Sequence, residues 1–395
     1  MRRNLRLYIY HLIRIFLFYV AEFISLFIKK ENNSNKILII RTDKIGDFII
    51  FSPTIKYLKN LYPDYKLYLL ANKEILPLIG FFPEIDTFIP LDVKKFQFNI
   101  FYYFKIFFKL KKMFFRKVFN PVYSRIITVD ELVRIVDSEE KIGFYGDNTT
   151  SENIKNFYNK FYTNLISIKK YSASLSEVDR YKEFLINLGY SEEKVMSLIP
   201  HIEVSEEILE EAKIILKKCG WNGNKFIVVH PGAGYIYRIW PIERFQKAIL
   251  FLKQKDYEIV LGGGKDEKWI SELIKKNIPE IIDLIGKVDL KIMAGVLCLA
   301  DFYFGSETGI LHLAAAVGCP TLCVLGGGHF GRFFPYGDLN KNRIVYDKNM
   351  KCMNDNWECA RYNKNKTAPC IEGIKTEDVL LELDNLINYL NNQKQ

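Results

Sequence analysis

The chain has 395 residues, of which 49% are hydrophobic and 26% are charged, and its formal net charge is +10. This length exceeds what one ordinary hydrophobic core needs and predicts two domains, and the composition excludes global disorder. The positive charge predicts an anionic partner, which can be a phosphate-bearing ligand, a nucleic acid or a lipid surface.

Residues 1–30 are predicted to form a membrane-associating helix. The stretch from Leu7 to Ile28 is apolar and aromatic, lacks the small-residue cleavage site of a signal peptide, and is long enough to span a bilayer. A narrow polar stripe recurs along it at helical spacing and consists of His11, Arg14, Glu22, Ser25 and Lys29. A spanning helix would bury two of these charges, whereas a helix in the plane of the membrane leaves them in water. We therefore expect an in-plane helix, with a single transmembrane helix as the alternative.

After a polar linker at 31–35, strands and helices alternate through a predicted N-terminal domain at 36–205. We expect strands at 37–40, 66–70, 86–89, 117–121 and 141–144, and helices within 46–61, near 73–79, and at 95–115, 128–137 and 176–188. Pro53 predicts a kink in the first helix or a restart with Ser52 as its cap.

The turn after the first strand carries a candidate catalytic base. Ile37 to Ile40 is a continuous apolar run, which is typical of a strand buried on both faces. Gly46 permits a close backbone approach, and Asp47 lies beyond the carboxyl end of the strand, where open α/β sheets bind ligands. Asp47 is therefore either a base acting on a bound molecule or a helix N-cap.

A basic and aromatic stretch occupies residues 94–120. Six further lysines and arginines follow Lys94 and Lys95 without an acidic residue between them, and the stretch also contains eleven phenylalanines and tyrosines. This mixture suits an anionic bilayer surface and also single-stranded nucleic acid. The alternative is a solvated helix whose aromatic face is core.

The alternating pattern restarts at Lys225 and predicts a C-terminal domain at 224–350, with the split near 200–224. We expect strands at 226–230, 258–261, 281–284, 301–304 and 321–325, and helices at 241–253, 266–277, 289–299 and 309–317. Repeated strand–helix units form parallel sheets, so the predicted fold class is α/β, with two doubly wound Rossmann-like domains facing a cleft. Residues 351–395 are expected to form a cysteine-containing tail that ends in a helix at about 376–392.

Glycine-rich turns after two of these strands are candidate phosphate sites. Gly232 lies in His-Pro-Gly-Ala-Gly directly after the strand at 226–230, and Arg238 follows shortly before the next helix. Free amides at a helix start attract phosphate, and an arginine can grip a diphosphate. A solvated loop arginine is the alternative. Gly263 ends the next strand in a Gly-Gly-Gly run, with acidic residues after it that suit a ribose or the first turn of a helix.

The segment Glu307-Thr308-Gly309 forms a tight polar turn between a strand and a helix rich in small residues. Amides in the first turn of that helix can receive a phosphate, and His312 lies one turn further along, where it is either functional or structural. The sequence lacks the GxxxxGK[ST] pattern, which argues against a P-loop ATPase.

Three of the seven cysteines, Cys352, Cys359 and Cys370, cluster near the C-terminus. Their spacing matches no standard zinc pattern, and a local disulfide, a metal site and ordinary thiols all remain open.

Taken together, these motifs resemble glycosyltransferase family 9, the heptosyltransferase-like enzymes of lipopolysaccharide assembly. The resemblance covers roughly residues 36–345 and depends on the ordered set: 37–41 with Gly46-Asp47 and Pro53, 230–234, 238–241, 262–263 and 307–315. It implies a GT-B fold with the donor nucleotide in the C-terminal half. It also implies an inverting transfer from a nucleotide sugar, typically ADP-heptose. This chain has arginine at 238, where the family usually has lysine, and glutamate at 307, where aspartate is usual.

The resemblance implies a role for each matching residue. Asp47 is the catalytic base, and the acceptor side of the site comprises Arg41, Lys44 and Gly46. The donor side comprises Gly232, Arg238, Gly263, Glu307, Thr308, Gly309 and His312. No cofactor and no obligatory metal are expected.

The expected partners are a nucleotide sugar, a lipid-linked saccharide and an anionic membrane surface, without nucleic acid. The expected location is the cytoplasmic face of the inner membrane. Three alternatives remain: an enzyme of this fold with another nucleotide sugar, a nucleotide-sugar epimerase, and a non-catalytic basic module that binds anionic lipid or nucleic acid.

Overall fold

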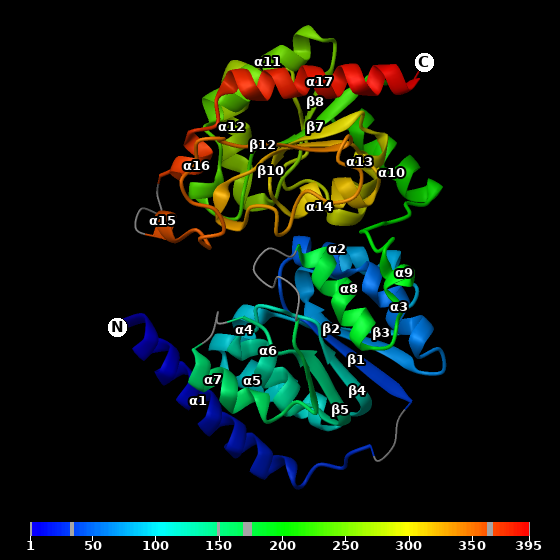
Figure 1. Cartoon of the computed structure of the whole chain (residues 1–395). Helices are drawn as coiled ribbons and strands as arrows, with labels where there is room; N and C mark the ends of the chain where they lie inside the picture. The colour runs from blue at the N-terminus through cyan, green and yellow to red at the C-terminus, as the bar shows by residue number, and fades with distance from the viewer. Residues whose placement is uncertain (1, 32–34, 148–150, 169–175, 362–365, 395) are drawn as a thin grey trace. The chain divides into compact units, whose positions relative to one another are not determined.

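The structure, a computed structural model, describes residues 2–31, 35–147, 151–168, 176–361 and 366–394. Contacts within the chain divide it into two compact units, which are drawn in Figure 1. Unit 1 comprises Met1–Lys44, Thr54–Ala173 and Asp179–Ser197, and unit 2 comprises Ile45–Pro53, Ser174–Val178 and Leu198–Gln395. The chain thus leaves unit 1 directly after the first strand, contributes a short segment to unit 2 and returns.

Unit 1 is built on one parallel sheet with the strand order β3-β2-β1-β4-β5-β6. Its strands are β1 (Lys36–Arg41), β2 (Lys66–Asn72), β3 (Thr87–Leu91), β4 (Phe114–Asn120), β5 (Asp137–Phe144) and β6 (Asn164–Ile166). The connecting helices are α3 (Pro53–Leu61), η1 (Lys73–Phe81), α4 (Val93–Phe98), α5 (Ile100–Lys111), α6 (Ile127–Ile135), α7 (Glu152–Asn159), α8 (Glu177–Asn187) and α9 (Glu192–Val195). In register, Ile37 pairs with Leu67 and Ile39 with Phe119, so β1 lies in the centre of the sheet.

Unit 2 repeats this plan with the strand order β12-β11-β10-β7-β8-β9, also parallel throughout. Its strands are β7 (Phe226–His230), β8 (Glu258–Leu261), β9 (Ile282–Asp283), β10 (Phe302–Ser306), β11 (Thr321–Val324) and β12 (Asn342–Val345). The larger helices are α2 (Ile45–Phe51), α10 (Glu206–Lys218), α11 (Ile242–Gln254), α12 (Lys268–Asn277), α13 (Leu290–Leu299), α14 (Gly309–Ala316) and α17 (Thr376–Lys394). Short turns complete it: η2 (Ile236–Arg238), η3 (Lys265–Glu267), η4 (Gly327–His329), α15 (Glu358–Arg361) and α16 (Pro369–Glu372).

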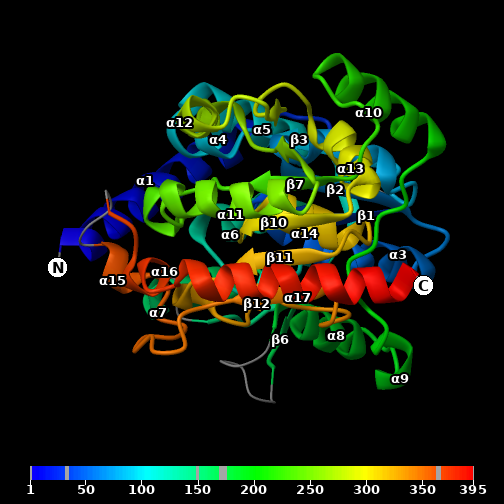
Figure 2. The same cartoon turned by 90° about the horizontal axis from the view of Figure 1, so that it is seen from above.

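Helices cover both faces of the unit 2 sheet. Helices α11, α12 and α17 share one hydrophobic cluster with the strands, and α11 and α17 lie side by side over the sheet in Figure 2. Helices α10, α13 and α14 pack against one another on the other face. The two predicted doubly wound Rossmann-like folds are therefore confirmed. In each sheet the strand order reverses once, between β1 and β4 and between β7 and β10, and ligands of such sheets bind at this switch point.

Several predicted boundaries were wrong. The helix expected at 95–115 is two helices, α4 and α5, with Asn99 capping the second, and its last residues belong to strand β4. The region at 200–224, where the sequence predicts the split between the two domains, follows the observed boundary at Leu198 and contains helix α10 (Glu206–Lys218). Pro53 begins a new helix as predicted, but the Ser52 hydroxyl donates to the Ile49 carbonyl at 2.9 Å instead of capping that helix.

Helix α1 (Arg2–Ser25) packs against unit 1 with its polar stripe inward. Arg14 Nε donates to Glu131 at 2.5 Å, and both side chains are buried. Further along, Glu22 forms an ion pair of 2.9 Å with Lys111. The expectation that this stripe faces water was therefore wrong, because it pairs with charges of α5 and α6.

The opposite face of α1 is apolar and exposed. Its members are Leu12, Phe16, Tyr19 and Phe23, each between 60% and 67% exposed. Among the described residues, Leu7–Ser25 is the one helical stretch long and apolar enough to cross a membrane by length and composition. Helix α1 is thus amphipathic in the inverted sense, with the polar side facing protein and the apolar side facing outward.

Candidate active site

Asp47 lies in the first turn of α2, which begins at Ile45. It is therefore the third residue of the helix and not its N-cap, so the alternative interpretation of this aspartate was wrong. The helix starts four residues after β1 ends at Arg41, and the intervening turn crosses from unit 1 to unit 2. Asp47 consequently belongs to the same compact unit as the predicted donor residues.

Two glycines allow α2 to lie directly on α14. A Cβ atom added to Gly46 would lie 2.7 Å from Cδ2 of His312, and one added to Gly309 would lie 3.0 Å from Cγ2 of Ile45. Any side chain at either position would force the helices apart, which explains why glycine is needed here. This contact fixes Asp47 beside the N-terminus of α14. It also places Gly46, predicted on the acceptor side, against a predicted donor residue.

Glu307 brings three charged groups of the predicted site together. Burial raises the pKa of this carboxyl to about 7, the Arg238 charge acts in the opposite direction, and the Asp47 charge raises the pKa further. One carboxylate oxygen of Glu307, Oε1, is buried and has no hydrogen-bond partner among the described residues. Asp47, Arg238 and Glu307 therefore share one electrostatic environment.

Arg238 is held by two side chains that the sequence analysis did not assign to the site. Its guanidinium carbon lies 4.5 Å from the centroid of the Trp357 ring, and Nη2 donates to Nδ1 of His329 at 3.4 Å. Burial, followed by the charge of Arg238, lowers the pKa of His329 to about 4, so this imidazole is neutral and can accept the bond. The stacking contact orients the arginine while leaving its charge uncompensated by either partner.

His230 connects the remaining donor turns. Its Nδ1 lies 2.9 Å from Thr308 Oγ1 and its Nε2 lies 3.1 Å from Glu267 Oε2. The Glu267 carboxylate lies against the backbone of Gly232 and Gly263, where a Cβ at either glycine would overlap it, and it accepts a 2.7 Å bond from the amide of Gly264. Although burial opposes ionisation, the bonds from His230 and this amide hold the pKa of Glu267 below its usual value. A carboxylate placed here suits sugar hydroxyls and would repel a diphosphate.

His312 is a neutral packing residue in this arrangement. Burial lowers the pKa of its imidazole to about 3. The ring stacks on Tyr336 at 5.9 Å and contacts Phe334 edge-on at 6.1 Å. It can therefore position Gly46 or accept a hydrogen bond, but it adds no positive charge near neutral pH.

The other predicted acceptor residues lie in unit 1. Arg41 is buried, with Nη2 2.6 Å from Asp43 and Nη1 donating to the Pro121 carbonyl at 3.3 Å, so it joins the ends of β1 and β4. Lys44 is exposed. Arg41 thus links the ends of the two strands between which the strand order of the unit 1 sheet reverses.

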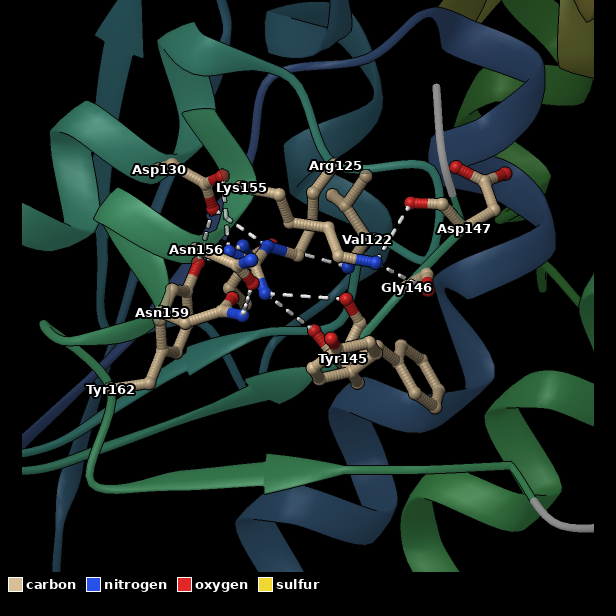
Figure 3. Close-up of polar contacts among 12 residues, drawn as sticks. Val122, Arg125, Asp130, Tyr145, Gly146, Asp147, Lys155, Asn156, Asn159 and Tyr162 are labelled. Carbon is tan, nitrogen blue, oxygen red and sulfur yellow. Dashed lines mark hydrogen bonds and ion pairs between the residues drawn. The ribbon is translucent and has the colours of Figure 1, made fainter. Parts of the chain in front are cut away.

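A buried polar network lies beside that switch point, at the carboxyl ends of β4 and β5 (Figure 3). Arg125 makes two bonds to Asp130, at 2.8 and 3.1 Å, and a third to the Phe144 carbonyl at 2.9 Å. Tyr162 donates to the same aspartate at 2.7 Å. In Figure 3, Lys155 points toward the backbone of Gly146, to which it donates at 3.4 Å. Because both charges of the pair are buried and satisfied, we interpret this network as a support for the strand ends.

Comparisons with known proteins agree with this geometry. The model of "Glycosyltransferase family 9 (heptosyltransferase)" matches residues 132–362, more than half of the chain. Lipopolysaccharide heptosyltransferase 3 of Escherichia coli is 25% identical over 292 residues, which cover 71% of this chain and 80% of that protein.

Two solved structures share the fold. A family 9 glycosyl transferase from Veillonella parvula has a TM-score of 0.75 at 16% identity, over 91% of this chain and all of the other. The E. coli ADP-heptose lipopolysaccharide heptosyltransferase II has a TM-score of 0.68 at 17% identity, with the same coverage. At these identities the likeness concerns the fold alone, and it confirms the predicted GT-B class. From the family match and the site together, the chain is a glycosyltransferase and belongs to family 9, the heptosyltransferase family.

Proposed function

We propose that this enzyme transfers a heptose from ADP-heptose to the core saccharide of a lipopolysaccharide precursor, with inversion at the anomeric carbon. The observation that carries the proposal is the packing of α2 on α14. It puts the Asp47 carboxylate in the same electrostatic environment as Glu307 and Arg238, next to the amides of a helix N-terminus. A carboxylate, a cation and free amides in one site are the groups that a displacement of a diphosphate requires.

In the proposed mechanism Asp47 acts as general base. It accepts the proton of an acceptor hydroxyl while the oxygen attacks the anomeric carbon, and the bond from that carbon to the diphosphate breaks. A single displacement of this kind inverts the configuration. The departing ADP gains negative charge, which Arg238 and the first amides of α14 stabilise. These fixed groups supply the charge stabilisation without a metal ion at the reacting atoms.

The donor half of the proposal agrees with the positions of the remaining predicted residues. Thr308 occupies the N-cap position of α14, and its hydroxyl bonds to His230 instead of capping the helix, so the helix N-terminus is held against the end of β7. Glu267 lies between Gly232 and Gly263, and we assign it to the ribose hydroxyls. The E. coli protein of similar fold is described as using ADP-heptose, which supports this nucleotide.

We further propose that the enzyme works at the cytoplasmic surface of the inner membrane with α1 lying in the interface. The apolar face of α1 points outward, while Arg14 is tied to the buried Glu131. A spanning orientation would have to break this pair and leave the glutamate buried without its partner, which favours the in-plane helix. Exposed lysines of unit 1 add attraction to anionic lipid and comprise Lys94, Lys95, Lys105, Lys109 and Lys112.

The deciding experiment replaces Asp47 by asparagine. We expect transfer from ADP-heptose to a heptose-deficient lipopolysaccharide core to fall by about 10²–10⁴-fold, since one general base is lost, while ADP-heptose binding changes little. Calorimetry measures binding and mass spectrometry of the acceptor measures transfer. Asp64→Asn, which removes an exposed carboxylate of unit 1, is the matched control and should keep the wild-type rate. Undiminished transfer by Asp47→Asn would remove this residue from the mechanism.

The donor itself is tested with a panel of nucleotide sugars. A ligand that binds the folded state raises its stability, so ADP-heptose should raise the melting temperature more than UDP- or GDP-linked sugars at equal concentration. A larger shift with another nucleotide sugar would reassign the donor while leaving the glycosyltransferase intact.

A further inference from the structure

Three cysteines that the proposed reaction does not use lie together in the C-terminal part of unit 2. Cys352 and Cys359 flank Asp355, and one sulfur or carboxylate oxygen from each of these three side chains lies within 4.8 Å of the others. Cys370, in α16, is not part of this 4.8 Å group, but its sulfur contacts Gly327, the glycine that also lies against the carbonyl of Cys352. All seven cysteines are described by the structure, and each is a free thiol.

The backbone around this cluster holds the side chains in place. Asn354, Asn356 and Trp357 adopt left-handed conformations, with φ between 52° and 61°. Asp355 Oδ1 accepts the amide of Trp357 at 2.9 Å. Left-handed backbone is unfavourable for residues with a side chain, least so for asparagine. A tryptophan in this conformation therefore indicates that surrounding interactions fix the loop.

The loop is also fixed from the side of η4. The Gly327 amide donates to the sulfur of Cys370 at 3.3 Å, and a Cβ added to Gly327 would overlap the carbonyl of Cys352. Amide-to-sulfur bonds are the outer-shell contacts that stabilise metal-bound thiolates. Cys352 and Cys370 therefore both contact Gly327, which lies in the same turn as His329.

We propose that Cys352, Asp355, Cys359 and Cys370 bind one zinc ion. Zinc takes four ligands from cysteine sulfur, histidine nitrogen and carboxylate oxygen; Cys352, Asp355 and Cys359 supply three that lie within 4.8 Å of one another, and we assign Cys370 as the fourth. Three sulfur donors select a thiophilic ion over magnesium or calcium. Two thiols of this cluster could alternatively form a disulfide, which would leave the third cysteine and the aspartate without a role.

The site would act on the reaction through Trp357. This residue lies inside the metal-binding loop, is 3% exposed, and its ring packs under the Arg238 guanidinium. The zinc ion would therefore fix the surface on which Arg238 is oriented. This consequence rests on the proposed function, in which Arg238 receives the donor diphosphate, whereas the metal site itself does not.

The test measures metal content before activity. The full chain, purified from a reducing cytosol without chelators, should contain one zinc per chain by elemental mass spectrometry. Its apo form should bind cobalt with the charge-transfer absorption of thiolate ligands. Cys359→Ala should weaken zinc binding by more than the roughly 10–100-fold typical of outer-shell changes. Cys298→Ala, which removes an exposed thiol of α13, is the control and should retain one zinc.

Two results would overturn the proposal: protein that is purified without zinc and takes up none when reduced and titrated, or a disulfide between Cys352 and Cys359 found by mass spectrometry. The link to the donor is tested separately. ADP should bind more weakly to Cys359→Ala than to Cys298→Ala, and equal binding would refute the link through Trp357. Because metal content is measured without substrate, failure of heptosyl transfer would leave the zinc result standing.

Discussion

Replacing Gly46 by alanine should slow sugar transfer without unfolding the protein. The added methyl carbon would lie 2.7 Å from His312 Cδ2, whereas ordinary contacts begin at 3.4 Å, so a shift of at least 0.7 Å is required. His312 is 4% exposed and is held between Tyr336 and Phe334, so it cannot swing aside. The start of α2 must therefore move, and it takes Asp47 with it.

The size of the effect follows from this displacement. A misplacement of about 1 Å in a catalytic group costs on the order of 10²-fold in rate, so a shift of this size predicts a loss of about 10–100-fold in kcat. Overpacking of this kind costs about 1–3 kcal/mol in the free energy of unfolding, which most domains tolerate. The rate loss should therefore exceed what the stability loss alone would cause.

The assay follows release of ADP under saturating donor and acceptor, with circular dichroism and thermal unfolding on the same samples. Gly80→Ala is the matched control, because no heavy atom lies within 4 Å of the added carbon. The double variant Gly46→Ala/His312→Ala should lose less than the sum of the two single losses, since removal of the ring makes room for the methyl group. A Gly46→Ala enzyme with wild-type kcat would refute the close packing of α2 on α14.

Three further predictions concern charge and the membrane. Folding raises the pKa of the Glu307 carboxyl from 4.5 to about 7. Between these pH values the unfolded chain has released this proton while the folded chain keeps it, so the free energy of unfolding of the wild type falls as the pH rises. Glu307→Gln should therefore gain up to about 3 kcal/mol over wild type in urea unfolding at pH 8 but little at pH 4, and a pH-independent difference would contradict this. Arg14→Met should cost about 3–5 kcal/mol because Glu131 is left buried and unpaired, and adding Glu131→Met should restore most of it; no recovery would mean that the pair is not the cause. Phe23→Asp should weaken flotation with anionic vesicles while Leu381→Asp, an equally exposed site in unit 2, should not, and equal flotation of both variants would exclude the α1 face.

The sheets could be predicted from the sequence because buried parallel strands are continuous apolar runs, as in Phe226–His230. The helix at 95–115 was overextended for a related reason. Phenylalanine is compatible with both a helix and a strand, so the pattern did not reveal that Phe114 and Phe115 begin β4. The second helix starts after Asn99, whose side-chain oxygen accepts a hydrogen bond from the Tyr102 amide.

The site was only partly predictable. Motif spacing predicted Asp47, Arg238 and Glu307 as site residues, because each follows a strand end, and the structure brings their charges into one environment. It could not reveal that α2 packs on α14, since this depends on two glycines distant in sequence, Gly46 and Gly309. Trp357 was not predicted, because its contact with Arg238 joins residues that lie far apart in the sequence.

The orientation of α1 shows why a polar stripe is ambiguous. A stripe that avoids lipid can face water or protein, and the sequence of one helix does not distinguish these. The partners of Arg14 and Glu22 are Glu131 and Lys111, which lie about a hundred residues away. Only the folded unit 1 brings these charges together.

The passage of Ile45–Pro53 into unit 2 has a consequence for recombination between related enzymes. A chimera joined once in the connecting region near residue 198 would combine the C-terminal half of one parent with the Asp47-bearing helix α2 of another. Such a hybrid would place the Gly46 and Asp47 counterparts of one parent on the α14 of another, and a mismatch of about 1 Å there would lower the rate on the order of 10²-fold. Exchange of donor specificity between family members should therefore require two segments, the C-terminal half together with residues 45–53, transplanted as a single functional block.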